Sequence, residues 1–259
     1  MRIGIHGKDF QNKSSRFVLK ILSALQEHKI ETWVSDKFLK QVKTPHINDF
    51  KLKIFDHSVS LRNLDFFLSL GGDGTLLESV TYIGKAEVPI LGINTGRLGF
   101  LATNSREDSE RAIESLVKGN YKIDTRTVLK LISSPHLFAK MNFALNDFTI
   151  IKKDTSAMIT VHVFVDGQLL NSYWADGVIV STPTGSTGYS LSCGGPLVYP
   201  ESESFIITPV SPHNLGTRPI VVSDKSEITF QIEGGSKNTL FLATMIRDVF
   251  DSRQQIKIL

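Results

Sequence analysis

The apolar positions of the first hundred residues alternate between patterns typical of strands and of helices. Helices are predicted at 15–28 and at 105–118, the second ending at Gly119. Short apolar runs predict strands, and the last two runs are compact enough to be buried on both faces: 2–6, 31–34, 64–70 and 88–93. This alternation predicts a parallel sheet covered by helices.

After Tyr121 the pattern changes to short segments rich in Val, Ile, Thr and aromatic residues. Asp166-Gly167, between two of these segments, is a strong signal for a two-residue hairpin. Strands are predicted at 128–133, 146–151, 158–165, 169–174, 205–209, 220–222, 227–232 and 255–259. We therefore expect a doubly wound α/β domain at 1–104 and a mostly antiparallel β domain at 105–259, with the extreme C-terminus free to pack back on the first. A cleft between two domains is a usual place for a ligand.

Composition and charge narrow the class of protein. The chain has 259 residues, 41% hydrophobic and 21% charged, which is enough to build a sizeable core. A net charge of +3 without any block of like charges suits a binder of anionic metabolites and is too small for a nucleic-acid protein. No apolar stretch approaches membrane-spanning length, and the N-terminus lacks a signal-peptide run. Together with the single cysteine, Cys193, these features predict a cytoplasmic protein.

A glycine loop between a buried strand and a helix carries the strongest chemical signal. Gly71-Gly72-Asp73-Gly74 follows the apolar run 64–70. Its glycines expose backbone N–H groups beside a helix N-terminus, which predicts a phosphate site. A carboxylate there repels phosphate, so Asp73 makes more sense as a general base that takes a proton from an attacking hydroxyl. The alternative is a Gly-Asp turn without chemistry.

Two further features accompany this loop. Thr75 and Glu78 have the spacing of a capping box, so we expect them to cap the helix that follows. The next strand ends in a second glycine loop, 94–100, which would face the same crevice and wrap a diphosphate. An ordinary loop is the alternative. Within it, Arg97 is a candidate phosphate partner or a solvated surface residue.

The second half holds a long polar segment, 181–196, dense in Ser, Thr and Gly. Such a loop can hold ribose hydroxyls and phosphates, and Tyr189 can offer an aromatic face to a base. The alternative is an irregular surface loop. Cys193 has no histidine nearby in sequence, so we do not expect a nucleophile. The histidines lack metal-ligand spacing, and neither a Walker loop nor a G-x-G-x-x-G fingerprint is present.

Taken together, these segments resemble the NAD kinase family. The long Ser/Thr/Gly segment is the specific part, because lipid kinases and 6-phosphofructokinases share the glycine-aspartate loop. The matching pieces run in order along the chain: Gly71-Gly-Asp-Gly-Thr75, Asn94-x-Gly-x-x-Gly-Phe100, Asn146-Asp147, Asp176-Gly177, Ser181-Thr-Pro-Thr-Gly-Ser-Thr-Gly-Tyr-Ser190, Gly194-Gly-Pro196 and Arg218-Pro-Ile-Val-Val222.

The resemblance implies an enzyme that transfers the γ-phosphoryl group of ATP to the 2′-hydroxyl of the adenosine ribose of NAD, giving NADP and ADP. It implies NAD bound between the two domains, a divalent metal, expected to be Mg²⁺, with ATP, and a homodimer or homotetramer in which neighbouring subunits complete the site. No metal ligand from the chain, no nucleic acid and no membrane is implied. Carried over by position, Asp73 is the proton acceptor, and the residues that contact NAD are Gly72, Gly74, Asn146, Asp147, Asp176, Thr184, Thr187, Gly188, Tyr189, Ser190, Leu191 and Ser192.

Several positions depart from the family pattern. Many members have a basic residue where this chain has Glu78. Alanine is common where this chain has Gly188, and glutamate where it has Asp147. The segment 241–248 lacks the Leu-Asp-Gly typical of the last hairpin.

Two other functions are considered. A lipid kinase would use the same glycine-aspartate loop, but its site should be apolar, unlike Asn146-Asp147 and the polar segment 181–196. A module that binds NAD(P) without turnover would have no need of Asp73.

Overall fold

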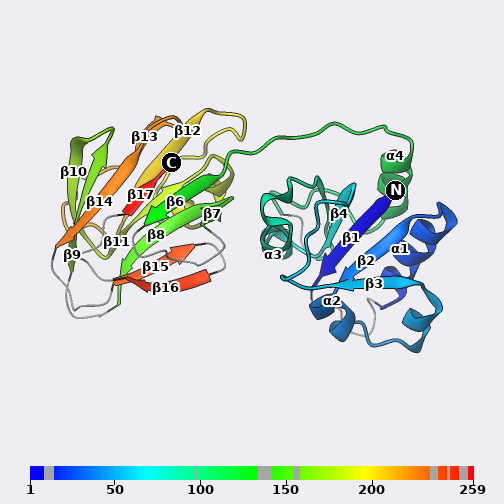
Figure 1. The fold of residues 1–259 in the computed structure, drawn as a ribbon. Helices are drawn as coiled ribbons and strands as arrows, with labels where there is room; N and C mark the ends of the chain where they lie inside the picture. The colour runs from blue at the N-terminus through cyan, green and yellow to red at the C-terminus, as the bar shows by residue number, and fades with distance from the viewer. Residues whose placement is uncertain are drawn as a thin grey trace. The chain divides into compact units, whose positions relative to one another are not determined.

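The computed structural model describes residues 1–8, 15–96, 99–133, 142–153, 158–233, 239–243, 246–250 and 256–259. Of these, 239–243 and 246–250 are described by their backbone alone. The chain forms two compact units, Met1–Asp124 and Thr125–Leu259 (Figure 1). The boundary therefore falls later than the 104/105 predicted from sequence. The reason is helix α4 (Ser109–Val117), which buries Ile113 and Leu116 in the core of the first unit.

The first unit is built on a five-stranded parallel sheet in the order β3-β2-β1-β4-β5 (Figure 1). Its strands are β1 (Arg2–Gly7), β2 (Glu31–Ser35), β3 (Leu52–Phe55), β4 (Phe66–Leu70) and β5 (Ile90–Ile93). Its helices are α1 (Ser15–Glu27), α2 (Asp36–Gln41), α3 (Asp73–Ile83) and α4, with the 3₁₀ turns η1 (Pro45–Asp49) and η2 (Gly84–Ala86). This order, reversing direction beside β1, is the doubly wound arrangement predicted from sequence.

Helices cover both faces of this sheet, which explains why its central strands, β1 and β4, are almost continuously buried. On one face the predicted stripe of α1 packs with α4 and the strands; its buried members are Phe17, Val18, Ile21, Leu22 and Leu25. On the other face Tyr82 and Ile83 of α3 pack against Phe55 and Phe67.

The sequence analysis did not predict β3 and α2. β3 is an edge strand with exposed central residues, so it lacks the apolar run of its neighbours. α2 is short and begins directly after β2, where the Ser35 hydroxyl accepts the backbone N–H of Phe38 at 3.1 Å as an N-cap.

The second unit is a sandwich of two six-stranded sheets that are mostly antiparallel, as predicted. One sheet has the order β10-β9-β14-β17-β6-β7: β6 (Leu129–Ser133), β7 (Phe143–Ala144), β9 (Ile159–Val165), β10 (Gln168–Ala175), β14 (Ile228–Glu233) and β17 (Ile256–Ile258). The other has the order β13-β12-β11-β8-β15-β16: β8 (Asp147–Lys152), β11 (Gly177–Ser181), β12 (Ser204–Val210), β13 (Ile220–Ser223), β15 (Thr239–Ala243) and β16 (Ile246–Phe250). Two short pieces, η3 (Thr184–Thr187) and α5 (Tyr189–Ser192), follow β11.

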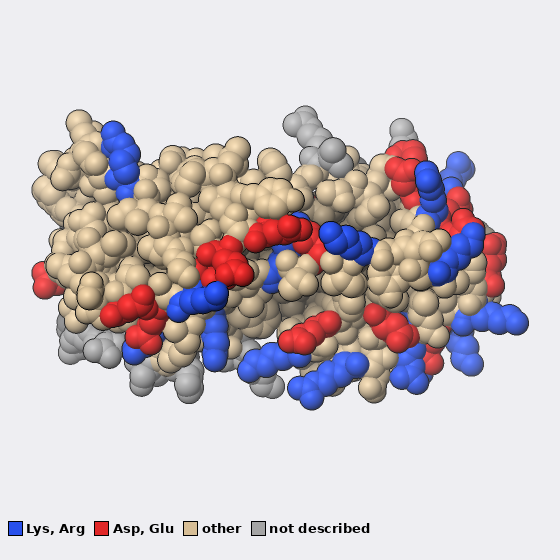
Figure 2. Space-filling view, turned by 90° about the horizontal axis from the view of Figure 1, so that it is seen from above, with Lys and Arg blue, Asp and Glu red and all other residues tan. Residues whose placement is uncertain are grey.

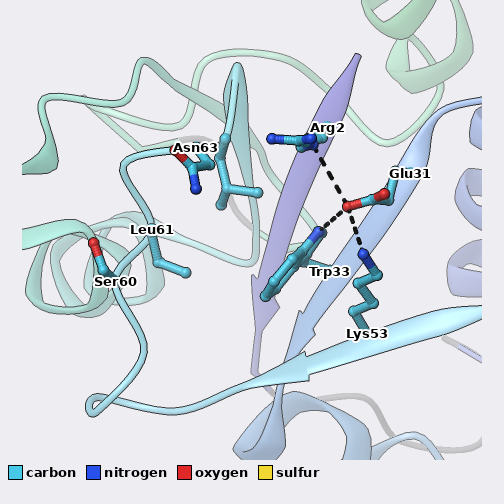
Figure 3. A pocket seen from close by; sticks show the side chains of 8 residues that line it. Arg2, Glu31, Trp33, Lys53, Ser60, Leu61 and Asn63 are labelled. Carbon is cyan, nitrogen blue, oxygen red and sulfur yellow. Dashed lines mark hydrogen bonds and ion pairs between the residues drawn. The ribbon is translucent and has the colours of Figure 1, made fainter.

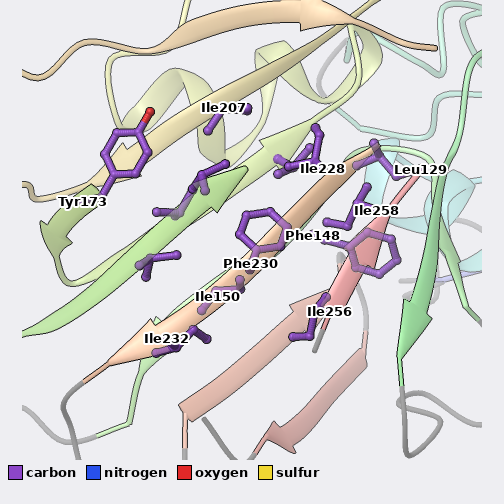
Figure 4. Close-up of a cluster of buried hydrophobic side chains, with 14 of the residues drawn as sticks. Leu129, Phe148, Ile150, Tyr173, Ile207, Ile228, Phe230, Ile232, Ile256 and Ile258 are labelled. Atoms are coloured by element: carbon purple, nitrogen blue, oxygen red, sulfur yellow. The ribbon is translucent and has the colours of Figure 1, made fainter. Parts of the chain in front are cut away.

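Side chains from both sheets meet in one apolar core. Phe148 and Ile150 of β8 face Phe230 of β14 and Ile256 of β17 (Figure 4). β17 pairs with β14 on one side and with β6 on the other. The extreme C-terminus therefore completes the sandwich of its own unit, and the expectation that it packs back on the first unit was wrong.

Two hairpins of the second unit, β9–β10 and β15–β16, lie where the sequence showed a turn signal or lacked one. Asp166 and Gly167 join β9 to β10 with φ of 51° and 80°, the positive values of a type I′ turn. β15 and β16 pair antiparallel although 241–248 lacks the family's Leu-Asp-Gly. β15 also pairs with β8, so sheet pairing holds this hairpin in place without that motif.

On the face shown in Figure 2, Lys and Arg side chains lie next to Asp and Glu side chains. None of the helices in the described part of the chain is long and apolar enough to cross a membrane.

The type I′ turn gives a direct test of the second unit's folding. Gly167→Ala should lower the free energy of unfolding by about 1 kcal/mol, because a Cβ disfavours the positive φ while the space around Gly167 is open. Asp166→Asn is the control, since asparagine tolerates positive φ and can still accept the Glu227 N–H. Urea denaturation measures both. Equal stability of Gly167→Ala and the parent would contradict the turn assignment.

Candidate functional site

The first glycine loop lies at the carboxyl end of β4, inside the first unit's sheet. α3 begins at Asp73, with Gly72 as its N-cap residue and no side chain capping it. A Cβ atom added at Gly72 or Gly74 would meet no described atom within 4 Å. The backbone N–H groups at this helix end are therefore open to a ligand, an arrangement suited to phosphate.

The Asp73 carboxylate joins this loop to the one after β5. Oδ1 accepts the backbone N–H groups of Leu101 and Ala102 at 3.0 and 3.1 Å, and Oδ2 accepts that of Phe100 at 2.8 Å. An ionised carboxylate has about four acceptor sites. Among the described contacts, Oδ2 therefore keeps an acceptor site for one more donor while the carboxylate is fixed in orientation.

Hydrogen bonds from the Asn94 side chain stabilise the second glycine loop. The Asn94 side-chain oxygen accepts the Gly96 N–H at 2.8 Å, and its side-chain nitrogen donates to the carbonyl of Ala102 at 3.3 Å. The two glycine loops meet, as the neighbouring strand ends predict. Arg97, the candidate phosphate partner, lies outside the described residues.

Gly99 is the position where the two loops come closest. A Cβ atom there would lie 2.2 Å from Asp73 Oδ1, far inside van der Waals contact. Any side chain at this position would therefore displace the Asp73 carboxylate, which gives the second loop a role in setting the geometry of the first.

The capping box predicted for Thr75 and Glu78 was wrong. Because α3 begins at Asp73, Thr75 already lies inside the helix, and its N–H bonds to the carbonyl of Gly72. Glu78 is buried and forms ion pairs with Lys8 and with Lys37, the latter at 3.2 Å.

Glu78 is the most perturbed carboxylate of the first unit. Burial by itself would raise its pKa, but hydrogen bonds from Lys8 and Lys37 and the charge of His6 outweigh burial and lower the pKa to about 2. The fully buried His6 ring lies 3.4 Å from the Glu78 carboxylate, and burial lowers the pKa of this histidine despite that neighbour.

In the second unit the polar segment is more regular than the loop expected from sequence. It folds into η3 and α5, and the buried Thr182 hydroxyl anchors it to the segment before β8: it donates to the carbonyl of Leu145 at 2.6 Å and accepts the N–H of Gly185 at 3.0 Å. The segment is therefore fixed on the sandwich and is not an irregular surface loop.

Asn146, Asp147 and Gly188 converge at one end of β8. A Cβ atom at Gly188 would lie 3.5 Å from Asn146 Nδ2 and 3.9 Å from Asp147 Oδ2. Asn146 Oδ1 is buried and has no hydrogen-bond partner among the described residues. Burial raises the pKa of Asp147 to about 6, against a smaller opposing effect of the Thr149 hydroxyl. The unpartnered Asn146 oxygen beside a glycine suits a ligand that brings a donor.

Asp176 lies apart from this pair. It forms an ion pair with Lys152 at 2.6 Å, at the opposite end of the β8–β11 ladder, in which Ser181 is the partner of Asp147. Five residues of strand separate the two carboxylates by about 17 Å along β8. Tyr189 is within electrostatic reach of both: burial raises its pKa, the Cys193 thiol adds to the shift, and Asp176 and Asp147 add smaller amounts.

The other residues predicted to contact NAD differ in how far their side chains are exposed to solvent. Tyr189, Leu191 and Ser192 are exposed on α5, and Thr187 and Gly188 are half-buried. The buried hydroxyls bond within the protein: Thr184 accepts from Arg126 at 3.3 Å, and Ser190 pairs with Thr208 at 2.8 Å. Exposed Tyr189 can meet a ligand directly, whereas the hydroxyl of Ser190 is already used.

The described residues offer no other equally suitable site. No group of three or more His, Cys, Asp or Glu among them could hold a metal ion. A pocket of about 210 Å³ opens at the amino-terminal ends of the first unit's strands, where the Glu31 carboxylate binds Arg2, Lys53 and the Trp33 ring N–H (Figure 3). Arg2 and Lys53 are both paired with Glu31, and ligands of open α/β sheets bind at the other edge.

Comparison with known proteins agrees with this geometry. Residues 3–121 match the model of the ATP-NAD kinase N-terminal domain, and residues 145–258 match that of the C-terminal domain. The chain belongs to the NAD kinase family. NAD kinase from Cytophaga hutchinsonii is 47% identical over 259 residues, covering 100% of this chain and 89% of the relative. NAD kinase from Christiangramia forsetii is 42% identical over 246 residues, covering 93% and 83%.

Solved structures of the NAD kinase family share the fold. Yeast NADH kinase complexed with NADH superposes with a TM-score of 0.87 at 25% identity, covering 100% of this chain and 79% of that one. An NAD kinase from Archaeoglobus fulgidus in complex with ATP gives a TM-score of 0.73 at 29% identity, covering 100% and 89%.

Sequence reasoning missed the partners of the recognised residues. Lys8, Lys37 and His6 gather around Glu78 from three different elements, and Lys152 holds Asp176. None of these residues belongs to a local motif. The one available signal was the departure from the family pattern at Glu78, because an acidic residue in place of a basic one requires different neighbours.

Asp147 should make stability depend on pH. Its pKa rises from 3.8 to about 6 on folding, so the folded state binds the proton more tightly and stability falls as pH rises through this window. Asp147→Asn should therefore be more stable than the parent by roughly 2–3 kcal/mol at pH 8, with the difference shrinking to nothing by about pH 3, below the unfolded-state pKa. Denaturation at a series of pH values measures this.

Glu201→Gln, which alters an exposed carboxylate of the same unit, serves as the matched control and should show no such difference. A pH-independent difference for Asp147→Asn would mean that Asp147 is ionised as readily in the folded protein as in the unfolded chain.

Proposed function

We propose that this chain transfers the γ-phosphoryl group of ATP to the 2′-hydroxyl of the adenosine ribose of NAD, giving NADP and ADP. The observation that carries the proposal is the Asp73 carboxylate, which stands between open glycines at a helix N-terminus and is oriented by three backbone N–H groups. A phosphate site with an oriented carboxylate is what transfer of a phosphoryl group to a hydroxyl requires.

Asp73 acts as general base through Oδ2, the oxygen with an acceptor site to spare among the described contacts. The 2′-hydroxyl donates to Oδ2 and loses its proton to it as the new O–P bond forms and the bond to ADP breaks. Backbone N–H groups of the glycine loop stabilise the charge spread over the transferred group. The transfer is direct and in line, so no covalent enzyme intermediate forms.

NAD binds the second unit at the cluster around Gly188. Buried Asn146 Oδ1 has no hydrogen-bond partner among the described residues, so it can accept a hydroxyl or amino group of NAD, and the Asp147 carboxylate lies near the same glycine. Tyr189 offers an exposed ring. Gly72 and Gly74 of the first unit contact NAD through their backbone. The second unit adds contacts from η3 and α5, and the placement of these residues on the two elements supports the role: Thr184, Thr187, Ser190, Leu191 and Ser192.

Three finer points belong to the same proposal. The divalent ion, Mg²⁺, enters with the ATP phosphates as part of the substrate. Asp176 completes the NAD site of a neighbouring subunit in a homodimer or homotetramer, which its distance from Asp147 supports. The lone Cys193 supports a cytoplasmic location.

One assay tests the function. The protein is incubated with ATP, Mg²⁺ and NAD, and NADP is measured with an NADP-specific dehydrogenase. NADP formation supports the proposal. Transfer to a lipid acceptor in place of NAD would favour the lipid kinase, and tight NAD binding without NADP would favour a sensor.

Asp73→Asn tests the base. The amide keeps the size of the carboxylate but cannot take the proton, so kcat should fall by about 10²-fold or more while the Kd for NAD changes little. Asp166→Asn is a matched control on the other unit and should keep parental kcat. Near-normal turnover by Asp73→Asn would remove Asp73 from the mechanism.

Tyr189→Ala tests the NAD contact of the second unit. Loss of the ring should weaken NAD binding by about 1–3 kcal/mol, measured by calorimetric titration. Tyr199→Ala, which removes a tyrosine that is 69% exposed in the same stretch of chain, is the control and should bind NAD normally. Unchanged affinity in a folded Tyr189→Ala protein would assign this segment a purely structural role.

A further inference from the structure

A second group of charged side chains lies beside the glycine loop, at the carboxyl edge of the first unit's sheet. Lys8 directly follows β1, and its backbone N–H donates to the carbonyl of Leu70 at 3.2 Å, the residue before Gly71. Lys37 lies in the first turn of α2, after β2. Ligands of open parallel sheets bind at this edge, so both lysines are placed where a substrate arrives.

The buried Glu78 carboxylate holds the two lysines together. Lys8 pairs with Oε2, and Lys37 with Oε1 at 3.2 Å. The Glu78 side chain is 8% exposed, whereas the lysine side chains are 37% and 51% exposed. Each ammonium group has three N–H donors and uses one on Glu78. Among the described contacts, the others remain for an anion.

Buried polar side chains lie beneath the Glu78 carboxylate and its two lysines. His6 Nδ1 pairs with the Ser35 hydroxyl at 2.7 Å, which also caps α2. His6 Nε2 and the Tyr82 hydroxyl are buried without a hydrogen-bond partner among the described residues. The Lys37 ammonium also lies 6.0 Å from the centre of the Tyr82 ring. The lysines are therefore oriented from below by residues of β1, β2 and α3.

The cluster is also within reach of the proposed base. Asp73 and Glu78 stand on the same helix, with an axial rise of about 7–8 Å between them, and the backbone of Lys8 is bonded to Leu70, three residues before Asp73. Two ammonium groups against one carboxylate leave a surplus of positive charge, and the N-terminus of α3 adds to it. The arrangement suits a polyanion that runs from the lysines to the glycine loop.

We propose that Lys8 and Lys37, positioned by Glu78, bind the polyphosphate chain of the phosphoryl donor. The inference rests on the proposed function, which requires a donor phosphate next to Asp73. It assigns the donor's phosphates to the first unit's lysines and leaves NAD to the cluster around Gly188. Glu78 acts as a positioning residue, which accounts for an acidic side chain near an anion.

Lys8→Met and Lys37→Met test this, since methionine keeps an unbranched apolar stem and removes the charge. Each should raise the KM for ATP about five-fold or more, the scale of one lost charge-assisted hydrogen bond, and leave the KM for NAD within about two-fold. Lys8→Arg and Lys37→Arg should recover much of the loss. Lys40→Met is the control: Lys40 is 77% exposed on the same helix as Lys37 and pairs with Asp36.

The outcomes separate this proposal from the function on which it rests. Calorimetric titration with Mg²⁺–ATP without NAD accompanies the kinetics. NADP formation with a parental KM and Kd for ATP in both folded methionine variants would overturn the lysine site and leave the function standing. Weaker ATP binding by these variants, in a protein that makes no NADP, would support the lysine site and overturn the function. An equal rise in the KM for NAD would also overturn the assignment to the donor.

Discussion

Three backbone hydrogen bonds to the Asp73 carboxylate hold the first unit's site together. They join the loop after β4 to the loop after β5, and they leave Gly99 without room for a side chain. A carboxylate can hold two loops in this way because its oxygens accept several N–H groups at once. The bonds fix the direction of the carboxylate before any ligand arrives, and such preorganisation is what an active site needs.

In the second unit a hydroxyl group, that of Thr182, holds two segments together. Thr182 links the segment before β8 to the start of η3 from within the apolar sandwich, so its bonds are protected from water. Two buried polar groups lie at this end of β8: the oxygen of Asn146, which has no hydrogen-bond partner among the described residues, and the carboxylate of Asp147, whose pKa burial raises. Burying these groups costs stability, and the large core shared by both sheets offsets that cost.

Charge at the sheet edge is set by contacts between distant segments. Glu78 of α3 is buried and pairs with Lys8, after β1, and with Lys37 of α2. The carboxylate stays ionised although it is buried because both lysines donate to it. Two lysines against one carboxylate leave a net positive charge beside the glycine loop.

The sequence by itself determined the two-part architecture, the family, and the placement of Asp73 at a strand end, because periodicity, turn residues and short motifs are local properties of the chain. Only the tertiary structure decided which residues complete each group: the N–H donors on Asp73, the lysines on Glu78 and the separation of Asp176 from Asp147. It also replaced the capping box with a buried ion pair and moved the domain boundary past α4. These outcomes depend on which strand ends and helix faces meet in space, and contacts between distant segments leave no local pattern in the sequence.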